Sequence, residues 1–132
     1  MSIGYIKVQV VSSTDKKKVN DGKINIYKGK SGEHIYMQYI NENFSGETKS
    51  IPVETPSKEL SQHPIPPGIL PYEPYDVTVT ATGYIDTIVR GVQAFPGVIA
   101  IQKIIMYPLP PGVKQGSISN IIIIPPPTLL IS

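Results

Sequence analysis

The sequence has no cysteine and no tryptophan, and only 17% of its 132 residues are charged. Without cysteine, the chain has no disulfide, no thiolate metal site and no cysteine nucleophile, so its stability must come from packing. The net charge of +2 gives no long-range field that would attract phosphate backbones. The single lysine run, residues 16–18, is typical of a solvated turn. We therefore expect no nucleic-acid partner.

Long hydrophobic runs are also absent. The longest, residues 121–127, falls far short of the roughly 20 residues that a membrane helix needs. Residues 1–5 lead directly into an alternating pattern, without the charged lead, apolar stretch and small-residue cleavage site of a secretory signal. We expect no membrane association, and synthesis in the cytoplasm without a signal peptide.

Proline and glycine, by contrast, are abundant, with 14 and 11 residues respectively. Proline inside a helix removes a hydrogen bond and clashes with the preceding turn, so helices are disfavoured almost everywhere. Alternating apolar and polar residues predict strands instead. The predicted strands cover residues 3–11, 23–28, 34–41, 75–81, 84–90 and 99–107. Their inward-facing side chains are predicted to be Ile6, Val8, Val10, Ile24, Ile26, Val77, Val79 and Ala81.

Residues 43–71 form a long proline-rich connection between these strands. Within it, Pro52-Val53 and Leu60 are candidates for short edge strands, because proline is admitted at sheet edges but not in central ladders. Several short strands with turn signals between them predict an all-β sandwich or barrel. The domain is expected to span residues 1–108, followed by a linker and an apolar tail over residues 109–132.

No arrangement of residues predicts catalysis. The acidic residues in predicted turns are Asp15, Asp21, Glu33, Glu42 and Glu47. They lack the facing pair that glycoside hydrolysis requires. His34 and His63 are far apart in the sequence, and no Gly-x-Ser-x-Gly elbow occurs. We predict a protein that is not an enzyme, with no cofactor, no metal and no catalytic residue.

The eight tyrosines leave two interpretations open. Flat amphipathic rings stack on sugars, which makes Tyr36, Tyr72 and Tyr75 candidates for a glycan-binding surface. Tyrosine is also favoured in strands, where the ring packs and the hydroxyl reaches the edge of the sheet. We favour packing over glycan binding.

Two segments resemble known families. Residues 72–84, YEPYDVTVTATGY, resemble the central signature of carboxypeptidase regulatory-like domains. Residues 91–102, GVQAFPGVIAIQ, together with a late Ile-Ile-Pro-Pro segment, are similar to the N-terminal region of clostridial spore cortex-lytic enzymes. This similarity runs from about Ile3 to Pro127 but does not extend to the catalytic part of those enzymes, so it lends no cortex-cleaving activity.

The resemblance implies a transthyretin-like or immunoglobulin-like antiparallel β-sandwich of about seven strands, with an extended C-terminal tail strand. It also implies a spore-associated location, in the coat, the cortex or at the spore surface. A spore cortex hydrolase and peptidoglycan become candidate partners on the same ground.

The tail is the most distinctive segment of the sequence. Residues 121–124 are four isoleucines followed by three prolines, and no charged residue follows Lys114. Isoleucine favours strands, and a charge-free segment followed by stiff, extended prolines suits addition to a sheet edge. The predicted subunit interface consists of Ile121, Ile122, Ile123, Ile124, Pro125, Pro126, Leu129, Leu130 and Ile131. Alternatively, the segment folds back as the last strand of its own domain, which a linker of about ten residues permits.

These observations predict a structural protein that polymerises when the tail of one subunit adds to the sandwich of its neighbour. The sequence leaves two alternatives open. The first is a regulatory or targeting module for a spore cortex-lytic hydrolase, and the second is a peptidoglycan-binding module.

Overall fold

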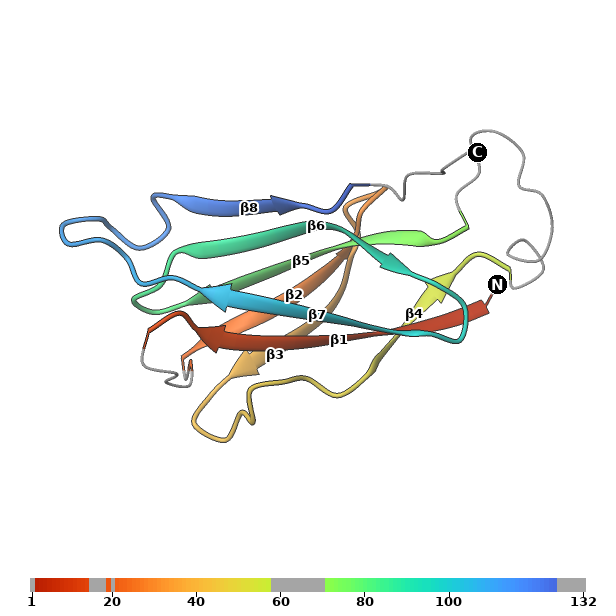
Figure 1. The fold of residues 1–132 in the computed structure, drawn as a ribbon, viewed down its shortest axis with the longest axis horizontal. Coiled ribbons are helices and arrows are strands. Elements are labelled where there is room, and N and C mark those ends of the chain that lie inside the picture. The colour runs from red at the N-terminus through yellow and green to blue at the C-terminus, as the bar shows by residue number, and fades with distance from the viewer. Residues whose placement is uncertain (1, 15–18, 20, 58–70, 126–132) are drawn as a thin grey trace, which may run out of the picture.

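The computed structural model describes residues 2–14, 19, 21–57 and 71–125. In these residues the chain forms eight strands and no helix, so no helix of the described part is able to cross a bilayer. The strands are β1 (Ser2–Ser12), β2 (Gly22–Lys28), β3 (His34–Ile40), β4 (Ile51–Thr55), β5 (Glu73–Ala81), β6 (Asp86–Ala94), β7 (Ile99–Met106) and β8 (Ser119–Ile123) (Figure 1).

The strands form two sheets that pack face to face, which confirms the predicted all-β sandwich. One sheet has three strands in the order β4-β1-β7, and the other has five in the order β3-β2-β5-β6-β8. Neighbouring strands are antiparallel except in two pairs, β1–β7 and β6–β8, which are parallel. β7 follows β6 but crosses to the opposite sheet, and this crossing brings it alongside β1 in the same direction (Figure 1).

The core lies between the two sheets and is built from the alternating positions that the sequence predicted. On β1, Ile6 and Val8 are fully buried and Val10 nearly so, while the residues between them face outward. On the five-stranded sheet, Ile24 and Ile26 face the core from β2. The same sheet contributes Val77, Val79 and Ala81 of β5 to the core. The period-2 pattern therefore located the buried faces of β1, β2 and β5 correctly.

The strand boundaries lie close to the predicted ones, with one informative exception. β6 continues beyond its predicted end at Arg90 because Gly91 adopts a positive φ of 87° and forms a bulge. The Gly91 N–H donates to the Asp76 carboxylate at 3.2 Å, and regular pairing with β5 resumes at Val92. The predicted edge strand at Pro52-Val53 is β4, whereas Leu60 lies outside the described residues.

The predicted domain boundary at residue 108 falls just after β7. Beyond it, β8 returns to the five-stranded sheet and pairs with β6 of the same chain. The fold-back alternative therefore describes the tail strand as it lies in this single chain.

Candidate subunit interface

The isoleucine run forms an edge strand of the five-stranded sheet. β8 runs parallel to β6 in a register that places Ile88 beside Ile121, Val89 beside Ile122 and Arg90 beside Ile123. The pairing ends where the Ile124 N–H donates to the Arg90 carbonyl at 2.9 Å. β8 pairs with no other strand of the described chain, so its outer edge is open.

Pairing with β6 leaves much of the surface of Ile121, Ile122 and Ile123 exposed. Ile121 is 51% exposed, Ile122 40% and Ile123 71%. Only Ile124, which is partly buried, packs against the core. Because β8 lies beyond the edge of the three-stranded sheet, no described strand faces it across the sandwich (Figure 1). The described residues of the chain therefore do not cover the apolar surface of these side chains.

The remaining predicted interface residues divide into two groups. Pro125 is exposed, and its carbonyl accepts a hydrogen bond from the Gln93 amide at 3.2 Å. The other four lie outside the described residues, and their role stays a prediction: Pro126, Leu129, Leu130 and Ile131.

Gly91 shapes the place where β8 ends. A Cβ at this position would lie 2.8 Å from the Ile124 carbonyl oxygen, closer than real Cβ atoms come to other atoms. The positive φ of Gly91 and this close approach both require glycine. The bulge in β6 is therefore fitted to the backbone of β8.

The chain leading into β8 is held by the Gln115 side chain. Its Oε1 accepts from the Gly83 N–H at 2.8 Å, and its Nε2 donates to the Tyr84 carbonyl at 2.9 Å. Gly116 follows with a positive φ of 81°, and β8 begins at Ser119. The last fixed point before the strand is thus Gln115, and Gly116 is the residue best able to change the direction of the chain.

A second open edge lies on the three-stranded sheet, at β7. The carbonyls of Val98 and Met106 accept from the N–H groups of Tyr5 and Ser13, which directs the even-numbered backbone groups of β7 toward β1. Backbone groups alternate sides along a strand, so the odd-numbered groups point away from β1. In the described chain β7 pairs with β1 alone, and Ile99, Ile101, Lys103 and Ile105 therefore form an open edge.

This edge is strongly apolar. Ile101 is 61% exposed, Ile99 51% and Ile105 39%, and Lys103 is the one charged residue of β7. The exposed side chains of Ile3 and Tyr5 on β1 extend the apolar surface across the outer face of the sheet. The sequence predicts β7 as a strand but does not reveal this edge, because only the order of strands shows which of them lacks a second neighbour.

The opposite edge of the three-stranded sheet is blocked. On β4, Pro52 has no N–H to offer, and the Glu54 carbonyl already accepts the Tyr75 hydroxyl at 2.6 Å. Burial raises the pKa of Tyr75 to about 12, and the nearby carboxylates of Glu73 and Glu54 act in the same direction. The Glu54 carboxylate also pairs with the Lys28 ammonium at 3.0 Å, and this contact raises the pKa of Lys28.

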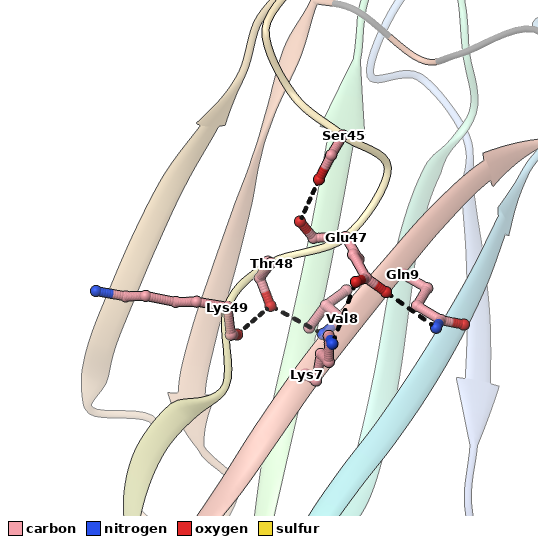
Figure 2. A network of polar contacts seen from close by, with 7 residues as sticks. All are labelled: Lys7, Val8, Gln9, Ser45, Glu47, Thr48 and Lys49. Atoms are coloured by element: carbon pink, nitrogen blue, oxygen red, sulfur yellow. Dashed lines mark hydrogen bonds and ion pairs between the residues drawn. The ribbon is translucent and has the colours of Figure 1, made fainter.

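Beyond β4, residues 45–49 cover the same side of β1 (Figure 2). The Val8 N–H donates to the buried Thr48 hydroxyl at 3.0 Å, and the Thr48 N–H donates to the Val8 carbonyl at 2.9 Å. The Glu47 carboxylate lies 3.1 Å from the Lys7 ammonium and accepts from the Gln9 amide. Hydrogen bonds from Lys7 and then Gln9 lower the pKa of Glu47.

The candidate sugar-stacking tyrosines are mainly part of the packing. Tyr75 is fully buried and Tyr72 is 4% exposed, while Tyr36 packs against the core and donates from its hydroxyl to Gln38. The packing interpretation is confirmed for all three side chains.

The histidines form no metal site in the part of the chain that the structure covers. His34 shares a 2.8 Å hydrogen bond with the Asn25 side chain, and His63 lies outside the described residues. Among the described residues, no group of three or more His, Cys, Asp or Glu side chains is able to hold a metal ion.

No family model and no curated protein matches this chain. Among solved structures, the chain is similar to GBS52, the minor pilin of the Gram-positive pathogen Streptococcus agalactiae, with a TM-score of 0.47 and 15% sequence identity. The alignment covers 86% of this chain and 48% of the pilin chain, so this chain spans about half the length of that structure. A similarity at this level assigns no function to the chain.

Proposed function

We propose that this protein is a non-enzymatic structural subunit that polymerises by β-strand addition, with the C-terminal strand β8 of one copy taking the place beside β6 of its neighbour. The observation that carries the proposal is the exposure of β8. Three consecutive isoleucines remain 40–71% exposed even when the strand is paired within its own chain. β8 therefore contributes little to the buried core of its own chain, so it can leave its place beside β6 at small cost and fill the same place on a second copy.

The acceptor position beside β6 is well defined, because the Gly91 bulge accommodates the Ile124 carbonyl and the Arg90 carbonyl accepts the Ile124 N–H. A donor strand from a second copy would make the same contacts, since exchange of an identical element requires no new interface. Gly116, just after the Gln115 anchor, would serve as the hinge at which the strand turns outward. Exchange of this kind joins subunits without any change in the core.

A cysteine pair distinguishes exchange from fold-back, since the chain has no cysteine of its own. Ile88→Cys with Ile121→Cys places the two thiols side by side in neighbouring strands. Oxidation after incubation at high concentration should give a ladder of disulfide-linked species on non-reducing gels. The matched control is Thr78→Cys with Ile88→Cys, which joins β5 to β6 and should close only within one chain. If the first pair also closes only within one chain, the proposal is wrong.

Deletion of residues 119–132 gives an independent test. The truncated chain should lose all polymers while keeping the thermal unfolding transition of the remaining sandwich. Polymers of undiminished length, seen by negative-stain electron microscopy, would contradict a role for the strand.

The proposal includes association with the spore, which is supported by the resemblance of residues 91–102 and the late Ile-Ile-Pro-Pro segment to the N-terminal region of clostridial spore cortex-lytic enzymes. Fractionation of a spore-forming source organism, with detection by antibody, tests that part separately. Recovery in the spore fraction would support it, and recovery only in vegetative cells would contradict it.

A further inference from the structure

Besides β8, the sandwich has a second open edge at β7, to which a further strand could pair. It presents unpaired backbone groups at four alternating positions, each carrying an outward-facing side chain. The Gln102 amide reaches over to donate to the Lys103 carbonyl at 3.1 Å, and no described residue bonds to the other open groups. A long apolar edge with one charge is the type of strand that adds a further strand from outside.

Among the described residues, β7 pairs with β1 alone, so no described strand covers this edge. The open positions of β7 span residues 99–105, which is about 20 Å at the rise of a β-strand. A second copy of the chain presents an edge of the same length with the same alternation of open backbone groups. The edge is therefore able to pair with its own copy in a symmetric contact.

We infer that β7 pairs antiparallel with β7 of a second copy, about a two-fold axis at Gln102, and so joins two three-stranded sheets into one continuous sheet of six strands. This inference rests on the proposed function for its role, because the pairing supplies a second contact through which a polymer grows. Strand exchange through β8 forms one contact between subunits, and the β7 pairing forms another at a different place on the fold.

The register follows from the sequence of β7. With the axis at Gln102, Ile99 lies opposite Ile105 of the second copy and Ile101 lies opposite its Lys103. All four open positions are then paired. A shift that moves the axis to Lys103 places two lysines opposite one another, which is unfavourable for like charges. A shift in that direction also pairs Tyr107, whose carbonyl already accepts the Ile85 N–H at 2.8 Å.

The pairing also covers exposed apolar surface. Ile99 and Ile105 form cross-strand pairs at both ends of the contact, and the outer faces of the two sheets join around the axis. The Gln102 side chain releases the Lys103 carbonyl, which then accepts the Ile101 N–H of the second copy. The second copy is thus matched to β7 in backbone, charge and apolar pattern.

The first test is the variant Gln102→Cys in the otherwise cysteine-free full chain. Gln102 directs its backbone groups toward β1, so across the axis it forms a non-hydrogen-bonded pair with Cα atoms about 4.5 Å apart, within the range of a disulfide. Oxidation should give a disulfide-linked dimer in high yield. The matched control, Gln38→Cys, lies on the edge strand β3 and should not. Absence of the Gln102→Cys dimer, or equal yield from both variants, overturns the inference; absence is also the result expected if a neighbour's tail occupies β7 instead.

The second test examines the register of the β7 pairing. Ile101→Lys places lysine opposite Lys103 twice across the axis and should weaken association at this edge at least tenfold by analytical ultracentrifugation. The double variant Ile101→Lys with Lys103→Glu restores opposite charges at the same positions and should restore association. Met37→Lys, on β3, is the control for added charge on an exposed edge. The inference is overturned if Ile101→Lys associates as the wild type does, or if the double variant is folded but fails to recover.

The experiments distinguish the β7 pairing from the β8 exchange. A Gln102→Cys dimer together with purely intramolecular closure of the 88/121 cysteine pair would contradict the β8 exchange and support the β7 pairing. The reverse combination would contradict the β7 pairing and leave the proposed exchange in place.

Discussion

The two edges of the three-stranded sheet, at β4 and at β7, differ in how they are protected. On the side of β4, Pro52 removes a donor, the Tyr75 hydroxyl occupies a carbonyl and residues 45–49 cover the rest of β1 (Figure 2). On the side of β7 and β8, backbone groups are open and isoleucines are exposed. Natural sheets protect their edges with proline, charge or covering loops, so the unprotected side is the one suited to contact another chain. The four predictions below alter one side or the other.

The largest effect is expected at Gly91, on the open side. Gly91→Ala should destabilise β8 by about 2–4 kcal/mol, because the positive φ is strained for alanine and the new Cβ meets the Ile124 carbonyl. Hydrogen exchange of the β8 amides should become much faster than in the wild type. Gly32→Ala is the matched control, since Gly32 has a φ of 75° and no atom within 4 Å of the new Cβ. If the β8 amides exchange hydrogen at the same rate in both variants, Gly91 does not stabilise the position of the strand.

On the protected side, Thr48→Val should destabilise the fold by about 2 kcal/mol. The substitution keeps the shape of the side chain but leaves the buried Val8 N–H without its acceptor. Chemical denaturation measures the change in free energy of unfolding. A neutral effect would show that water replaces the hydroxyl and that residues 45–49 do not seal β1.

The Tyr75 hydroxyl gives a smaller and pH-dependent contribution. Tyr75→Phe should cost about 1 kcal/mol at neutral pH, because the Glu54 carbonyl loses its donor. The folded pKa of Tyr75 is raised from 10.0 to about 12, so its contribution is complete below pH 10 and is lost as the pH rises toward 12. Thermal melts across this window should show the wild type losing stability more steeply than the variant. Parallel curves would contradict the assignment.

The smallest effect is expected at Glu47, whose contact with Lys7 lies at the surface. The folded pKa of Glu47 is lowered from 4.5, so its contribution is present above pH 4.5 and is lost as the pH falls through the lowered value. Glu47→Gln should therefore reduce stability slightly at neutral pH, and the difference should vanish in acid and at high salt. Glu42→Gln, in an exposed turn, provides the baseline. A difference that persists in acid would rule out the ionic contact as its cause.

Much of the fold could be predicted from the sequence because each strand buries one face. Alternation located the inward residues of β1, β2 and β5, and the proline rule located β4 as an edge strand. Patterning did not show that β7 joins β1 in parallel in the other sheet, because a side chain's face says nothing about which strand lies beside it. For the same reason the open edge of β7 was not recognisable.

The candidate site was predicted in part. The isoleucine run was identified from its composition, and its β-strand conformation is observed. The strand beside it, β6, was not identifiable from the sequence. The bulge at Gly91 depends on a positive φ and on contacts with residues distant in the sequence. A glycine between Arg90 and Val92, inside an otherwise regular strand pattern, was the available signal.

Four identical side chains in succession cannot distinguish one strand alignment from the next, because a slip of one residue exchanges isoleucine for isoleucine on both faces. At β8 the alignment is fixed instead by backbone features. The missing Cβ of Gly91 admits the Ile124 carbonyl, and Pro125 has no N–H with which to extend the ladder. If copies are linked through this strand, Gly91 and Pro125 fix its alignment, and the spacing between successive subunits is therefore constant.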